Sequence, residues 1–163
     1  MKRFLCILLI ASAIMSGCQT SGERIKEPVT FYYVKSNYQR ELTNAFLSEQ
    51  REASGHRDDL SYLMALYLMG PIDENLTSPI PAGTRIYIQE NNAYNVKLKL
   101  SDTEKTLSDA EFSVASACLA MTCLELTGTQ TVTVSSGSRS VTMTSGNLEL
   151  TDTNMTIALE ETQ

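Results

Sequence analysis

The feature that most constrains the fold is an apolar stretch that lies between Ser108 and Gly128. Ser108 followed by Glu111 forms a capping box, which predicts the start of a helix, and Gly128 predicts its end. Large apolar residues lie on nearly every side of this helix, with many Ala and Ser residues between them. A helix that is apolar nearly all round is buried, and its small residues allow it to lie close against a sheet.

Length and composition limit the classes of protein that are possible. With 163 residues and 42% hydrophobic content, the chain suits one globular domain and is too apolar for a disordered protein. No stretch reaches the roughly 20 apolar residues that span a bilayer. The formal net charge of −6, without a basic patch, argues against nucleic-acid binding and against adsorption to anionic lipid headgroups.

The other predicted elements are recognised by hydrophobic spacing and turn residues. Val29 to Val34 is β-branched and aromatic and predicts a strand, which a weaker extended segment at 44–51 can pair with. A first helix opens at Asp58 and Asp59 and stops at Gly70. Further strands are predicted at 84–89, 94–100, 130–135 and 140–144. We therefore expect a single α+β domain with a mixed or antiparallel sheet of about five or six strands, covered by two helices.

The N-terminus has the parts of an export signal. Lys2 and Arg3 precede an apolar segment from Phe4 to Met15, and Ser16-Gly17-Cys18 follows. An apolar residue, two small residues and a cysteine resemble the bacterial lipobox, in which the cysteine thiol takes a diacylglycerol. We expect a lipoprotein signal peptide at 1–17, cleavage between Gly17 and Cys18, and a lipid anchor carrying palmitate at Cys18. The alternative is an ordinary secretory signal with a chance cysteine.

These features predict the order of the chain and its place in the cell. A polar tether at 18–27 follows the signal peptide, then an α+β domain at 28–150 and a C-terminal tail at 151–163 without a clear partner. The protein is expected to be extracytoplasmic and held at the cell membrane through Cys18, with no nucleic acid among its partners.

Five short pieces in the middle of the chain resemble a known family. They are Leu68-Met69-Gly70-Pro71, Ile80-Pro81-Ala82-Gly83-Thr84, Val96-Lys97-Leu98-Lys99-Leu100-Ser101, Leu119-Ala120-Met121-Thr122 and Thr131-Val132-Thr133-Val134. Their order and spacing, over roughly residues 29–145, are similar to the GerMN domain of bacterial sporulation and spore-germination proteins. Members of that family are often lipoproteins, and the domain sometimes accompanies cell-wall amidases.

The resemblance implies a non-enzymatic extracytoplasmic module that assembles protein complexes, with a role in sporulation or spore germination and a protein partner in the cell envelope. The alternative is a cell-surface receptor for a small ligand or cell-wall fragment. A receptor predicts an enclosed pocket with convergent polar groups, whereas an interaction module predicts a filled core and an exposed edge or patch.

Residues able to carry chemistry are few. Cys118 and Cys123 are either a redox pair or two buried thiols, and five residues along a helix separate Cα atoms by more than a disulfide allows, unless the helix breaks. The lone His56 has no other soft ligand beside it, so no metal site is predicted. The acidic pairs Asp58-Asp59 and Asp73-Glu74 suit a helix start and a loop rather than a hydrolase.

Two further groups complete the candidates. The serines at 135–140 lack a Gly-x-Ser-x-Gly elbow, so no nucleophile is predicted there. Tyr32 and Tyr33 adjoin in a strand and should point to opposite faces, which leaves open that one of them is an interface anchor. We therefore predict no catalytic residue, no metal and no cofactor.

Overall fold

The computed structural model describes residues 26–37, 45–101 and 103–147. The predicted signal peptide, the cleavage and lipid-attachment site at Gly17 and Cys18, and the tail at 151–163 lie outside these residues. The elements in chain order are β1 (Pro28–Lys35), β2 (Phe46–Glu52), α1 (Leu60–Leu68), β3 (Leu76–Thr77), β4 (Ile86–Asn91), β5 (Asn95–Leu100), α2 (Asp109–Thr127), β6 (Thr131–Ser136), β7 (Arg139–Thr144) and the 3-10 turn η1 (Ser145–Asn147).

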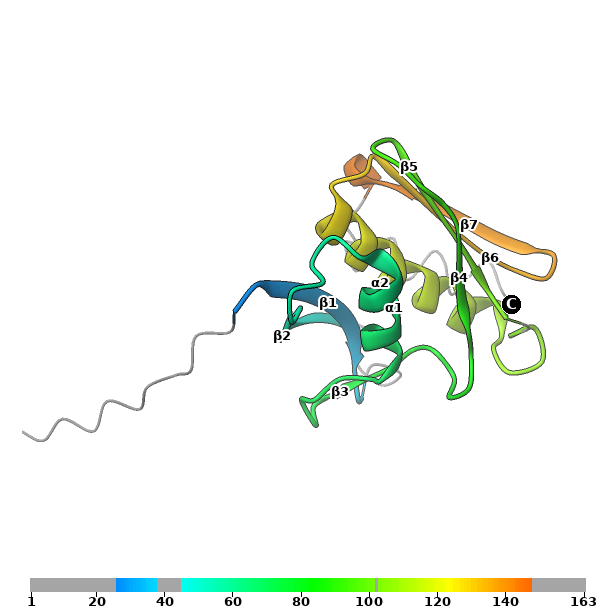
Figure 1. The fold of residues 1–163 in the computed structure, drawn as a ribbon. Helices are drawn as coiled ribbons and strands as arrows, with labels where there is room; N and C mark the ends of the chain where they lie inside the picture. Colours follow the sequence, from blue (N-terminus) through cyan, green and yellow to red (C-terminus); the bar gives the residue numbers. More distant parts are fainter. Residues whose placement is uncertain (1–25, 38–44, 102, 148–163) are drawn as a thin grey trace, which may run out of the picture.

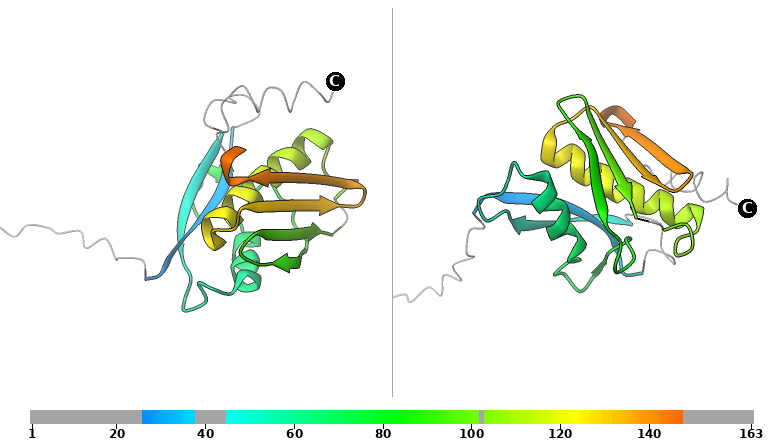
Figure 2. Two further views of the ribbon diagram at one scale, coloured as in Figure 1. Left: turned by 90° about the horizontal axis from the view of Figure 1, so that it is seen from above. Right: turned by 45° about the vertical axis from the view of Figure 1, so that its right-hand side comes forward.

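The α+β class and the two helices are confirmed, but the seven strands of the described residues form two sheets rather than one. The first sheet has the order β2-β1-β3 and the second β4-β5-β6-β7. In the second sheet β5 and β6 run parallel, and α2 makes the crossover between them, as a parallel pair requires. The helices lie between the two sheets (Figures 1 and 2), and α2 contacts both β1 and β6.

One strand edge explains why the sheets stay separate. The backbone N–H of Tyr32 in β1 donates to Thr122 Oγ1 of α2 at 3.0 Å, and the Tyr67 hydroxyl of α1 donates to the Tyr32 carbonyl at 3.1 Å. Further along β1, Val34 and Lys35 pair with β3. The two helices and β3 therefore occupy the side of β1 that β2 leaves open, so no further long strand can pair there.

The long helix α2 has the caps that the sequence predicts. Ser108 and Glu111 form both bonds of the capping box, and Gly128 ends the helix with a φ of 66° in the left-handed region. Among the described residues α2 is long and apolar enough to cross a membrane, but most of it is buried inside the domain. Burial of this kind is typical of the core helix of a globular protein.

The first helix is fixed to β1 by an aromatic cluster. The rings of Tyr33 and Tyr67 stack with centroids 4.8 Å apart, and Phe31 meets Tyr67 edge-on at 5.8 Å. The Tyr33 hydroxyl donates to the carbonyl of Tyr67, so both phenols are buried and hydrogen-bonded. Desolvation accordingly raises the pKa of each phenol. This cluster holds α1 against β1 of the first sheet.

Candidate binding groove at the edge of strand β4

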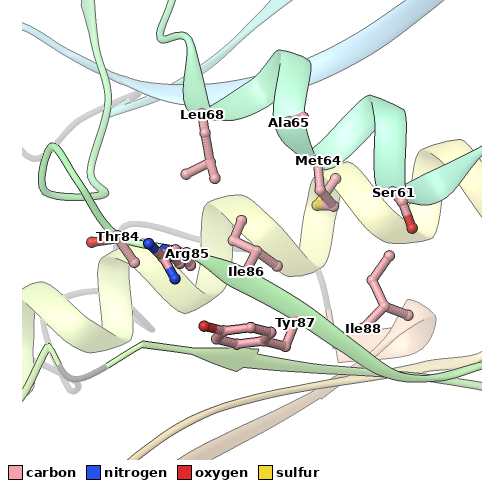
Figure 3. A pocket seen from close by; sticks show the side chains of 9 residues that line it. All are labelled: Ser61, Met64, Ala65, Leu68, Thr84, Arg85, Ile86, Tyr87 and Ile88. Carbon is pink, nitrogen blue, oxygen red and sulfur yellow. The ribbon is translucent and has the colours of Figure 1, made fainter.

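A groove of about 340 Å³ runs between α1 and β4. Figure 3 shows Met64 and Leu68 extending from α1 toward the side of β4 that bears Ile86 and Ile88. The full lining is Ser61, Met64, Ala65, Leu68, Thr84, Arg85, Ile86, Tyr87 and Ile88. Its walls are therefore one helix face and the outermost strand of the second sheet.

The backbone of β4 has hydrogen-bonding capacity on the groove side. Arg85 directs both peptide groups toward β5, because Ser101 N–H donates to its carbonyl at 2.8 Å and its own N–H donates to Ser101 Oγ at 2.9 Å. Alternation along an antiparallel pair then turns the peptide groups of Ile86 and Ile88 away from β5. β4 has no strand on that side, and no described residue hydrogen-bonds to these groups.

Charge in the groove is confined to one residue. Arg85 is the only charged side chain in the lining, and none of the salt bridges among the described residues includes it. The rest of the lining is mostly apolar. The groove thus presents an apolar wall, unpaired backbone groups and one cation on a chain whose formal net charge is −6.

The two cysteines of α2 lie outside this groove. Cys118 and Cys123 are buried and unbonded to each other, as expected for structural thiols. Burial raises the pKa of the Cys123 thiol to about 12 and that of Cys118 well above its usual value. The thiolate is the reactive form of cysteine, and redox or nucleophilic cysteines have a low pKa that favours it. Neither Cys118 nor Cys123 has such a low pKa.

We expect these thiols to resist iodoacetamide in the folded protein at pH 8 and to react in denaturant. Their raised pKa values also stabilise the fold below about pH 9, the usual thiol pKa, and this contribution falls as the pH rises toward about 12. Mass spectrometry of alkylated protein measures the labelling. Rapid native alkylation of Cys118 or Cys123 would contradict the structural assignment.

The remaining candidates have local roles. His56 stacks on the Tyr62 ring at 4.3 Å, and Asp59 caps α1 by accepting from the Tyr62 N–H. Asp73 accepts from the backbone and side chain of Asn75 within its turn. The described residues contain no group of three or more His, Cys, Asp or Glu placed to hold a metal.

The serines near the β6–β7 turn also serve the structure. Buried Ser136 accepts hydrogen bonds from Thr103, and Ser138 donates to Glu104, whose carboxylate pKa is lowered by these bonds. Beside them, the Arg139 guanidinium bonds to Asp109 and lies over the Phe112 ring. This cluster joins the hairpin to the start of α2.

The two tyrosines of β1 divide as the strand alternation predicts. Tyr33 is fully buried and Tyr32 is half-buried on the other face. Neither belongs to the groove. Sequence reasoning did not identify the residues of β4 and α1 as a site. Their hydrophobic spacing predicted a strand and a helix, but it did not show that β4 lies at the edge of a sheet.

Comparison of the chain with protein-family models, with curated proteins and with solved structures gave no match.

Proposed function

We propose that this chain is a non-enzymatic, lipid-anchored interaction module of the bacterial cell envelope, and that its groove accepts an extended segment of a partner protein. The observation that supports this proposal is the pair of outward-facing peptide groups at Ile86 and Ile88 beside an apolar helix face. An added strand satisfies such groups through main-chain bonds, while pockets for alternate side chains give specificity.

The lining suggests the chemistry of the partner segment. Side chains that enter the groove meet Met64, Leu68, Ile86 and Ile88, so they should be apolar at every second position. Among the described residues that line the groove, Arg85 alone is charged, which favours an acidic residue near that end. The segment expected is an alternating apolar strand that carries a carboxylate.

The anchor belongs to the same proposal. A diacylglycerol at Cys18 would hold the domain at the membrane and raise its effective concentration toward partners in that plane. The resemblance to GerMN domains supports a place in sporulation or spore germination. An open, mostly apolar groove suits a protein segment better than the small ligand or cell-wall fragment of the alternative, which needs convergent polar groups.

The anchor is tested by fractionating cells that express the wild type or Cys18→Ala. We expect the wild type in the membrane fraction and the variant in soluble or precursor form, with the wild type alone labelled by a palmitate analogue. Equal partitioning of the two proteins and absence of lipid label would contradict the anchor.

The groove is tested with Ala65→Arg, which places a long cation in the lining from an exposed position of α1. Met69→Arg is the matched control, because Met69 is 77% exposed and outside the lining. We expect a partner that crosslinks to the wild type in membranes to be retained by Met69→Arg and to fall at least tenfold with Ala65→Arg. Equal capture by both variants, with unchanged thermal unfolding, would contradict the groove as the binding site.

A further inference from the structure

Strand β4 itself has the sequence that its groove favours. Ile86 and Ile88 lie on the side that faces α1, and Figure 3 shows Tyr87 on the opposite side of the strand. Glu90 adds a carboxylate near the end of the same strand. β4 is therefore an alternating apolar strand with an acidic residue, which is the kind of segment that the groove is proposed to accept.

A β-bulge places this carboxylate on the same face as Arg85. The register of β4 on β5 shifts between Ile88, which pairs with buried Leu98, and Glu90, which pairs with exposed Lys97. Glu90 and Lys97 also form an ion pair at 2.6 Å, as residues on one face do. Arg85 comes three residues before Ile88, so strand alternation turns it to the same solvent face.

We propose that the partner is a second copy of this chain, and that the two β4 strands pair antiparallel about a two-fold axis at Tyr87. This inference rests on the groove of the proposed function and names the partner that occupies it. The outward peptide groups set the register, because a hydrogen-bonded pair joins residues whose peptide groups both point out of the edge. Ile86 of each copy then lies opposite Ile88 of the other, and both residues face the α1 side of the joined sheet.

Charges and side chains are complementary in this register. Arg85 lies opposite the bulge of the second copy, where Glu90 is on the same face, and the two-fold axis makes this contact twice. None of the salt bridges among the described residues includes Arg85. The Tyr87 side chain, 49% exposed, forms a cross-strand aromatic pair with its equivalent. A shift by two residues in either direction would place Tyr87 or Gly83, instead of Arg85, opposite the bulge.

The surroundings of β4 leave room for a second strand. The part of α1 that borders the groove has the small exposed side chains of Ser61 and Ala65. Lys99, which pairs with Tyr87 on β5, would lie three strand spacings from its equivalent, about 14 Å. This distance exceeds the Debye length of about 8 Å at physiological salt. The net charge of −6 on each chain repels at longer range, and salt weakens this repulsion in the same way.

The two-fold axis is tested with Tyr87→Cys in the full chain, in membranes of cells that express it, at 0.15 M salt. Residues that face each other in a non-hydrogen-bonded pair have Cα atoms about 4.5 Å apart, within the disulfide range. Diamide takes up the two protons and two electrons released when the thiols join. Lys99→Cys is the matched control, because it is exposed on the same face one strand further in. The wild type measures any crosslinking through its own cysteines.

We expect Tyr87→Cys to form a disulfide-linked dimer at least tenfold faster than Lys99→Cys, as measured on non-reducing gels. Equal rates in the two variants, or no dimer with Tyr87→Cys, would overturn the proposal.

The register is tested by reversing charges in the Tyr87→Cys chain. Arg85→Glu places two acids opposite each other at both ends of the interface, and Glu90→Arg places two cations there. We expect each reversal to slow dimer formation at least fivefold and the double reversal to restore it, because each contact joins Arg85 of one copy to Glu90 of the other. An unchanged rate with the single reversals, or no recovery in the double variant, would overturn the register.

The two proposals fail separately. If Ala65→Arg abolishes partner capture while Tyr87→Cys gives no dimer, the groove stands and its partner is a different protein. If Tyr87→Cys gives the dimer while Ala65→Arg leaves capture unchanged, the β4 strands pair and the groove is not the binding site.

Discussion

Replacing Tyr67 by Ala is expected to lower the free energy of unfolding by about 3–5 kcal/mol, the range for truncating a buried aromatic residue. The side chain is fully buried, stacks on Tyr33 at 4.8 Å and meets Phe31 edge-on. Its hydroxyl also donates to the carbonyl of Tyr32. The variant therefore loses apolar burial, ring contacts and a hydrogen bond that closes the edge of β1.

Tyr67→Phe separates the contribution of the hydrogen bond from that of the buried ring. It keeps the ring but leaves the Tyr32 carbonyl without its donor, so a loss of about 1–2 kcal/mol is expected. Urea unfolding followed by circular dichroism gives both values, with Tyr94→Ala as a control because Tyr94 is 71% exposed. If Tyr67→Ala were no more damaging than Tyr67→Phe, the stacked cluster would not be the contact that holds α1.

Local chemistry explains why many boundaries could be predicted from the sequence. The capping box at Ser108, the Asp59 cap and the left-handed Gly128 each depend on residues within one helical turn. The burial of α2 likewise follows from a short-range pattern. Pairing of β2 with β1 was also predicted, because the two strands are close in sequence.

Long-range contacts explain what the sequence did not reveal. The split into two sheets depends on Thr122 of α2 bonding to the backbone of Tyr32, and no local pattern marks that hydroxyl as a partner for β1. The short strand β3 has only two residues, too few to show alternation. A strand was predicted at 84–89, but its place at the sheet edge beside α1 follows from topology alone.

The loop after α1 depends on one carboxylate. Glu49 Oε2 accepts from the N–H groups of Ile72 and Asp73, both at 2.8 Å, and Glu49 Oε1 lies 3.4 Å from Arg51 Nη1. Arg51 also donates to the Gly70 carbonyl at 2.9 Å. Both charged side chains are largely buried, with 11% and 9% of their surfaces exposed. β2 thus fixes the chain directly beyond the helix that forms one wall of the groove.

Glu49→Ala is therefore expected to cost about 3–5 kcal/mol, because removing one partner leaves the other charge buried and uncompensated. Glu49→Gln keeps an acceptor of the same shape and should cost less, while faster hydrogen exchange at Ile72 and Asp73 should accompany the Ala variant. Glu90→Ala is the matched control, since its ion pair with Lys97 is exposed and contributes little. Urea unfolding of the three variants decides the point, and equal stability of Glu49→Ala and Glu90→Ala would show that the 70–73 loop is held by other contacts.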